Sequence, residues 1–387
     1  MFFNVSQRQQ SNFSHFYNLG PFCVSTDAGW NAVDLGQYQV VYKGYTDTNT
    51  LEASLTQIIN STEPELLGNF CVLVYNSETD TLKIKSDCYR GFPIWFDSEG
   101  VTNLTKKVNT AWTDSLIEIK HDGSVIESKF DLIGNIDTSP VDLDHAVEYI
   151  DQLLIKKTQN FLKYNTLPVK TFLSGGVDSL LVYSYLQRFT DSFELVRGEH
   201  FEYDKFWLLN SGTIKNNFWG YKQLHHWNQS CVLTSGTPGD EFMLRSPTTA
   251  DLFLKFHGQS VVELLESHWK DCLHYEYFYL PKNYKLFQTQ TVDPAWNRKS
   301  LLWNLCNIVV NDWQHWHLGN TVTWTPLRDL EIFKTLIRLP VQHALGQIMH
   351  SKISKQLIEK NKPGLSRLIS NQKNSGNVLS NLCDFYY

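Results

Sequence analysis

A short stretch of serines, glycines and an aspartate is the part of the sequence best suited to chemistry. In chain order it contains Ser174, Gly175, Gly176, Asp178 and Ser179. An apolar run precedes it and apolar residues at helical spacing follow it, which predicts a buried strand, a glycine turn and a helix N-terminus. The free N–H groups and the dipole of such a helix favour an anion. Asp178 would repel a phosphate but suits a Mg²⁺ ion beside one, so we expect a pocket for pyrophosphate and metal.

A second group of glycines and carboxylates follows the apolar segment from Ser230 to Thr234. Its members are Gly236, Thr237, Asp240 and Glu241. We expect the segment to be a strand, and open α/β sheets bind their ligands beyond the carboxyl ends of strands. Asp240 would then complete a two-carboxylate Mg²⁺ site with Asp178. The alternative is an ordinary Gly-Pro turn that an aspartate caps before the next helix.

Apolar periodicity predicts the elements that must position these two groups. Residues 141–164 have helical spacing, with Asp142 or Asp144 as the N-cap. This helix leads into the strand before the first group, and Ser192 to Arg197 is the next predicted strand. The order is therefore β-α-β, which predicts a parallel sheet. From about Thr248 onward we expect a mainly helical chain.

The first part of the chain has a different pattern. Gln37 to Gly44 is strand-like, and Leu51 to Ile59 predicts an amphipathic helix. Phe70 to Tyr75 is an unbroken apolar run, which predicts a strand covered on both faces. Asn76 to Asp80 is a predicted turn, and Thr81 to Lys85 returns as an alternating strand, so the pair forms a hairpin. Sheets with one helix-covered face fit this pattern better than a parallel βαβ series.

Composition limits the class of protein. A chain of 387 residues can form two domains, which we place at residues 1–140 and 141–387. The net charge of −6 makes a nucleic-acid partner unlikely on electrostatic grounds. Seven cysteines occur without a Cys-x-x-Cys pair, which is typical of buried thiols in a reducing compartment. With neither a secretory signal nor an apolar run of membrane-spanning length, we expect a cytoplasmic protein with no membrane partner, and a homodimer is compatible with the sequence.

Two resemblances follow from these residues. Ser-Gly-Gly-x-Asp-Ser resembles the PP-loop of the ATP pyrophosphatases, which cleave ATP to AMP and pyrophosphate. The group around Asp240 resembles the S-G-x-G-x-D-E motif of asparagine synthetases, and residues 66–96 resemble their N-terminal glutaminase domain. The resemblance implies an α+β sheet domain of the Ntn, class II amidotransferase type at residues 1–140. It implies an α/β parallel-sheet PP-loop synthetase domain with a helical C-terminal part at residues 141–387.

The resemblance also implies roles for single residues. ATP would contact Ser174, Gly175, Gly176, Asp178, Ser179, Gly236, Asp240 and Glu241, with Mg²⁺ on the two aspartates. Lys352-Ile-Ser-Lys355 resembles the motif whose lysine holds the α-phosphate and the leaving pyrophosphate. Both lysines lie on one predicted helix, so either could fill this role, and a solvated lysine face is the alternative. Residues 324–331 resemble a motif of the family's substrate pocket.

Several positions depart from the family. The family's nucleophilic cysteine is replaced by Phe2, and the nearest cysteine is Cys23. Lys43-Gly44-Tyr45 replaces the Asn-Gly-Glu that holds glutamine, and the aspartate that takes the glutamine amine is missing. We therefore expect no glutamine hydrolysis. Thr237, a catalytic candidate beside Lys352 and Lys355, stands near the position of a family glutamate that receives protons from ammonia, and a hydroxyl is a poor general base. The amine should then come from a larger substrate or from the activated molecule itself.

The implied reaction transfers AMP from ATP to a substrate carboxylate and releases pyrophosphate, after which an amine attacks to form an amide. The partners would be a small-molecule or peptide carboxylate and an amine donor, with ATP and Mg²⁺ as cofactors. One alternative is an intramolecular cyclase similar to β-lactam synthetases and lasso-peptide cyclases, and another is an ammonia-dependent asparagine synthetase. A PP-loop tRNA-modifying enzyme is the alternative from another class. It would predict a basic surface and often a reactive cysteine pair, and the sequence has neither.

Overall fold

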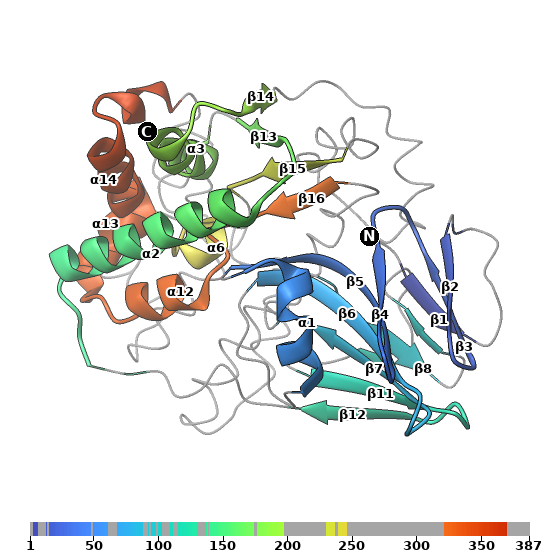
Figure 1. Cartoon of the computed structure of the whole chain (residues 1–387). Coiled ribbons are helices and arrows are strands. Elements are labelled where there is room, and N and C mark those ends of the chain that lie inside the picture. Colours follow the sequence, from blue (N-terminus) through green and yellow to red (C-terminus); the bar gives the residue numbers. More distant parts are fainter. Residues whose placement is uncertain are drawn as a thin grey trace, which may run out of the picture.

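The computed structural model contains two antiparallel sheets followed by one parallel sheet with helices (Figure 1). The residues it describes are 3–6, 13, 15–47, 49–60, 68–87, 92, 94–97, 100–102, 109–110, 115–129, 137, 139–173, 176–196, 230–236, 239–245 and 321–369. The predictions for Phe2, Ser174, Gly175 and Thr237 lie outside these residues. We call residues 3–129 the N-terminal part and residues 139–369 the C-terminal part. The mixed composition and the order of the sheets agree with the expected sequence of α+β and then α/β structure.

Two six-stranded antiparallel sheets form the N-terminal part. The first has the order β10-β8-β9-β1-β3-β2, and the second has the order β12-β11-β7-β6-β5-β4. The strands of the first are β1 (Phe3–Ser6), β2 (His15–Leu19), β3 (Phe22–Thr26), β8 (Trp95–Asp97), β9 (Gly100–Thr102) and β10 (Asn109–Thr110). Those of the second are β4 (Asn31–Leu35), β5 (Tyr38–Thr46), β6 (Gly68–Asn76), β7 (Thr81–Ser86), β11 (Ser115–Lys120) and β12 (Val125–Lys129).

Strand β6 is buried on both faces, as its unbroken apolar sequence predicted. Alternate side chains point to opposite faces of a strand, so Cys71 and Leu73 enter the core that the two sheets share. Val72 and Val74 enter a second core, against helix α1 (Leu51–Asn60). The predicted hairpin is also confirmed, because β6 pairs antiparallel with β7. The helix therefore covers the outer face of the second sheet, and the first sheet covers its inner face.

A four-stranded parallel sheet forms the centre of the C-terminal part. Its order is β14-β13-β15-β16, and the strands are β13 (Val169–Phe172), β14 (Glu194–Val196), β15 (Cys231–Thr234) and β16 (Thr321–Trp324). All three pairings are parallel, as the β-α-β order predicted. Strand β16 was not predicted, because it lies in a region that we expected to be mainly helical. Its sequence, Thr-Val-Thr-Trp, is rich in β-branched residues, which favour a strand.

Helices complete the C-terminal part. Those around the sheet are α2 (Leu143–Tyr164), α3 (Val177–Phe189), α6 (Gly239–Phe242), α12 (Leu330–Leu336), α13 (Val341–His350) and α14 (Lys352–Asn361), followed by a 3-10 turn (Leu365–Leu368). Asp142 is the N-cap of α2, and its carboxylate accepts a hydrogen bond from the His145 N–H at 2.8 Å. Helices α2, α3 and α14 share one apolar core with β15 and β16. Within the described residues, no helix is long and apolar enough to cross a membrane.

A buried ammonium group joins the two parts. Lys157 on α2 lies 2.8 Å from an Asp47 carboxylate oxygen in the N-terminal part and 2.7 Å from one of Asp329 in the C-terminal part. Burial alone would lower the pKa of Lys157, but the carboxylates of Asp329 and Asp47 outweigh it and raise that pKa. The hydroxyl of Tyr45 also accepts a hydrogen bond from the Thr325 N–H at 3.2 Å. The contact between the parts is therefore specific and charged.

We predict that Lys157→Met lowers the free energy of unfolding by about 3–5 kcal/mol, because it leaves two carboxylates buried without their cation. Urea denaturation followed by circular dichroism measures this loss. Lys156→Met is the matched control, because Lys156 is the exposed neighbour on the same helix and should change stability little. A Lys157→Met protein within about 1 kcal/mol of wild type would contradict the prediction.

Candidate functional site

The two glycine-containing loops leave the parallel sheet side by side. Strand β13 pairs with β14 on one side and with β15 on the other. From β13 the chain continues to β14 on one side, and it then returns to form β15 on the other side of β13. The strand order therefore reverses between β13 and β15. In open α/β sheets, the carboxyl ends of strands at such a reversal form a crevice where ligands bind. The loops after β13 and β15, which carry the two predicted motifs, flank this crevice.

Two glycines allow the second loop to pack against the first turn of α3. A Cβ atom at Gly236 would collide with the backbone of Asp178 and Ser179. A Cβ atom at Gly239 would lie 2.6 Å from Cγ of Asp178. Since neither position has room for a side chain, glycine at both is required for this close approach. The structure thus brings the two motifs, far apart in the sequence, into direct contact.

A buried arginine bridges the carboxylates of the two motifs. The guanidinium of Arg245 bonds to Oδ1 of Asp178 and lies 2.9 Å from Oδ1 of Asp240. The Arg245 side chain is 2% exposed, whereas that of Asp178 is 15% and that of Asp240 is 41% exposed. The site is therefore closed at the arginine and open at Asp240. We did not single out Arg245 from the sequence, although a basic residue soon after an Asp-Glu pair was the available signal.

The backbone before Arg245 is held in an uncommon conformation. Leu244 has φ 55°, in the left-handed region, and its side chain is fully buried. This conformation costs about 1–2 kcal/mol for a residue with a Cβ. It turns the chain back, so that the Arg245 N–H donates to the Asp240 carbonyl at 2.6 Å. The surrounding packing offsets this cost, which indicates that the position of Arg245 is fixed by the fold.

Burial dominates the protonation of Asp178. Loss of water raises the pKa of its carboxyl well above the usual range. Arg245 opposes this shift, and the neighbouring Asp240 carboxylate adds to it. Two carboxylates beside one guanidinium leave one negative charge, which a proton or a metal cation can balance.

These residues fit a Mg²⁺ ion that is bound mainly through a ligand. Magnesium typically uses one or two carboxylates together with substrate phosphates and water. Asp178 and Asp240 supply two carboxylates, and the exposed side of Asp240 leaves room for the other ligands. Among the described residues there is no cluster of three or more His, Cys, Asp or Glu side chains that could hold a metal by themselves. The donor set therefore suits a metal–phosphate complex.

The first turn of α3 has the other residues of the first motif. Gly176 is the N-cap of α3 and provides no side-chain hydrogen bond to the first N–H groups. The hydroxyl of Ser179 donates to the Gly176 carbonyl at 3.0 Å, and its side chain is buried. Glu241 is half-buried on α6, next to Asp240. The helix thus begins at the crevice with N–H groups that a phosphate can use.

The lysine pair lies at the start of α14. Lys352 is exposed and Lys355 is half-buried. Gln347, which is fully buried, donates to the Met243 carbonyl at 2.8 Å and accepts from the Ile353 N–H at 2.8 Å. Through this amide, the first turn of α14 is fastened to the chain segment between Asp240 and Arg245.

The far ends of α3 and α14 also meet, which sets their relative direction. Arg188 at the end of α3 donates to the Asn361 side chain at 2.9 Å. Helices α3 and α14 therefore run in the same direction, and their first turns lie on the same side. This orientation agrees with a role for one of the two lysines at the crevice, and the choice between Lys352 and Lys355 stays open.

In the N-terminal part, the stretch predicted not to hold glutamine serves packing instead. The Lys43 side chain is 1% exposed, and its ammonium donates to the Ala28 carbonyl at 2.8 Å, with Asp27 at 3.6 Å. Gly44 has φ +113°, and a Cβ atom there would collide with the Asn69 carbonyl on β6. Cys23 is buried within β3. Lysine and glycine at these positions therefore have structural reasons that need no ligand.

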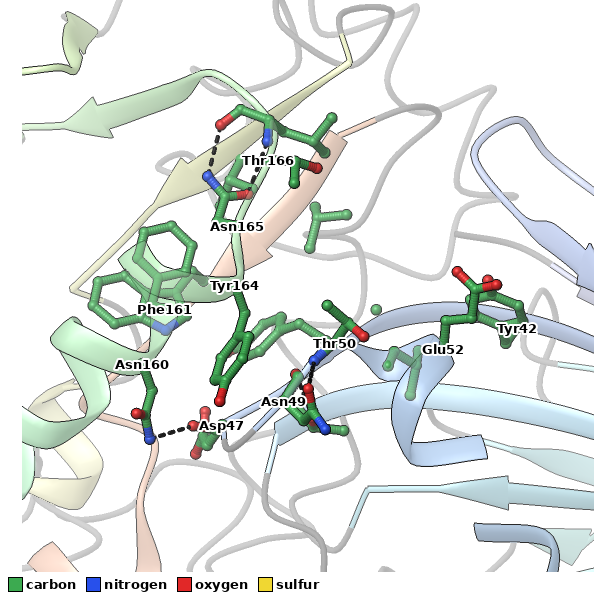
Figure 2. Close-up of a pocket in the computed structure, with 18 of the residues that line it drawn as sticks. Tyr42, Asp47, Asn49, Thr50, Glu52, Asn160, Phe161, Tyr164, Asn165 and Thr166 are labelled. Carbon is green, nitrogen blue, oxygen red and sulfur yellow. Dashed lines mark hydrogen bonds between the residues drawn. The ribbon is translucent and has the colours of Figure 1, made fainter. Parts of the chain in front are cut away.

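A separate cavity of about 390 Å³ lies between the two parts (Figure 2). Val232 and Val322, each the second residue of its strand, line its sheet side. Trp324, the last residue of β16, lines the cavity as well, whereas the two motifs follow the carboxyl ends of β13 and β15. Phe161 on α2 stacks on Trp324, with ring centroids 4.2 Å apart. None of the described residues of the two motifs lines this cavity, so we treat it as distinct from the carboxylate site.

Two buried lysines make the N-terminal part sensitive to pH. Burial lowers the pKa of Lys43 to about 7. Burial, and then Lys83, lower the pKa of Lys85 to about 8, and its ammonium donates to the Ile58 carbonyl. Both groups bind a proton more weakly in the folded than in the unfolded chain, where the ordinary pKa is 10.5. These two lysines should therefore contribute a rise in stability with pH between about 7 and 10.

We predict that Lys43→Met reduces this slope, because it removes one group that contributes at most about 1.4 kcal/mol per pH unit. Urea denaturation at several pH values between about 7 and 10 measures the slope. Lys120→Met is the matched control, because Lys120 is exposed on β11 and should leave the slope unchanged. Equal slopes for wild type and Lys43→Met would show that Lys43 does not titrate in this range.

Comparison with known proteins adds no identification. No protein-family model matches the sequence, and no curated protein matches it. The feature of the structure that bears most directly on function is the contact between the two loops at the carboxyl edge of the parallel sheet.

Proposed function

We propose that the protein is an ATP-dependent, AMP-forming ligase that activates a substrate carboxylate and joins it to an amine. The observation that carries this proposal is the contact of the two loops, with Asp178 and Asp240 on either side of one cation. Two carboxylates next to the N-terminus of α3, where the N-cap is a glycine without a side chain, suit a triphosphate with its metal. The resemblance of both loops to asparagine-synthetase motifs points to the same chemistry.

Different residues of the site would have different roles in the adenylation reaction. The first N–H groups of α3 would hold the phosphates, and Asp178 and Asp240 would hold Mg²⁺, which offsets charge on the triphosphate when it is bound. Lys352 or Lys355, at the start of α14, would stabilise the negative charge that develops on the leaving pyrophosphate. The substrate carboxylate attacks the α-phosphorus and becomes an acyl-adenylate. AMP is then a far better leaving group than oxide, which makes attack by an amine accessible.

The N-terminal part supports an amine source other than glutamine. Cys23 is buried within a strand, and Lys43 occupies the interior with its amine bonded to a backbone carbonyl. We propose that the amine belongs to a larger substrate or to the activated molecule itself, as in an intramolecular cyclase. Free ammonia is the other source compatible with these residues, and it would make the protein an ammonia-dependent synthetase.

We predict that Asp178→Asn and Asp240→Asn each lower carboxylate-dependent ATP–pyrophosphate exchange by about 100-fold or more, because an amide is a poor ligand for a hard dication. A screen of amino acids and short peptides as the carboxylate, with AMP and pyrophosphate as measured products, tests this. Asp144→Asn, an exposed carboxylate on α2, is the matched control and should retain full exchange. ADP and orthophosphate as products would refute the proposed reaction.

We also predict that the purified protein releases no glutamate from glutamine, since no described cysteine of the N-terminal part is accessible. A coupled glutamate assay at saturating glutamine measures this directly. Turnover that Cys23→Ala abolishes would identify an overlooked nucleophile and overturn the prediction. Efficient formation of asparagine from aspartate, ATP and ammonium would instead assign free ammonia as the amine source.

A further inference from the structure

We propose that Arg245 is a built-in cation that competes with a divalent metal for Asp178 and Asp240, and that it transfers to phosphate oxygens when metal and nucleotide bind together. The nucleotide half of this proposal rests on the proposed function, whereas the competition with metal does not. Its consequence is that the two carboxylates bind little metal alone and bind it well with a polyphosphate.

Arg245 competes with a metal ion because it already occupies carboxylate oxygens that the metal would bind. The guanidinium takes Oδ1 of both carboxylates, so a metal ion shared by the two aspartates meets a fixed positive charge at the same place. With both carboxylates ionised, as metal binding requires, the three side chains carry a net charge of −1. A dication added alone would give an excess of positive charge in a partly buried site, which disfavours it. A polyphosphate that arrives with the metal reverses this balance.

The guanidinium can exchange its partners because of its shape and surroundings. Its planar fork of N–H donors matches a phosphate as well as a carboxylate. Asp240 is 41% exposed, so the side of the bridge at which a ligand would enter is open. The exchange requires the bond to a carboxylate to be replaced by one to a phosphate oxygen, with no change in the number of charged partners.

The fold holds Arg245 at this position by several independent contacts. Leu244 adopts its left-handed conformation immediately before Arg245. Gln347 fixes the Met243 carbonyl, and the Arg245 N–H is bonded to the Asp240 carbonyl. A surface arginine that happened to approach two aspartates would need none of these. These contacts hold the backbone so that the guanidinium lies between the two motifs.

Binding of Mn²⁺, followed by electron paramagnetic resonance, tests the proposal apart from any enzymatic activity. Arg245→Gln should bind Mn²⁺ alone about tenfold more tightly than wild type, because the competing charge is gone. The same variant should bind α,β-methylene ATP with Mn²⁺ about tenfold more weakly. Arg188→Gln, at the far end of α3, is the matched control and should change neither affinity.

Three further results decide the matter. If Mn²⁺ alone binds Arg245→Gln no more tightly than wild type, Arg245 is only a structural bridge and the proposal is wrong. If Arg245→Gln does not fold by circular dichroism, Arg245→Met takes its place, and it should bind Mn²⁺ more tightly because it also removes the competing positive charge. An unchanged affinity in that variant would also overturn the proposal. Tighter Mn²⁺ binding by Arg245→Gln, together with no ATP–pyrophosphate exchange by the wild-type protein in the carboxylate screen, would leave the competition standing and refute the ligase function.

Discussion

The ammonium of Lys157 is the interaction on which the arrangement of the two parts depends. It balances Asp47, at the end of β5, and Asp329, which caps α12 by accepting the Glu331 N–H at 2.7 Å. Because α12 follows β16 after a short turn, the same charge fixes where the chain leaves the parallel sheet. A buried ion group of this kind contributes little net stability against an apolar replacement, but any partner left alone is costly. It therefore selects one docking geometry of the two parts over others.

Arg245 is a second cation between two carboxylates, at the proposed active site. The two clusters differ in how far their side chains are exposed to solvent. The side chains around Lys157 are at most 9% exposed, whereas Asp240 beside Arg245 is 41% exposed. The cluster around Lys157 is nearly closed to solvent, although Lys157 and Asp47 also line the cavity between the two parts. An open cluster with the same charges can exchange one partner for a ligand. Exposure, rather than charge, separates the structural cluster from the proposed functional one.

Local sequence patterns predicted the elements whose apolar residues recur within a few positions of one another. The two-faced strand β6, the hairpin with β7 and the Asp142 cap of α2 are examples. Strand β16 was missed because only its pairing with β15 makes a four-residue segment a strand. Arg245 was missed because its place depends on the φ angle of Leu244, and Lys157 because a lysine on an amphipathic helix looks solvated in sequence. Long-range charge pairs carry no periodic signal.

The position of β16 gives the N-terminal part a structural role beside the parallel sheet. In the described sheet, β16 ends the strand order and so presents one edge. Unpaired strand edges invite wrong pairing and are usually covered. Tyr45, from the end of β5, accepts the N–H of Thr325 directly after β16, and Lys157 draws Asp47 to the same place. A C-terminal part expressed alone would therefore expose this edge together with the uncompensated charges of Lys157 and Asp329. The N-terminal part therefore covers the β16 side of the parallel sheet and neutralises the charge of Lys157, a role that needs no catalytic activity of its own.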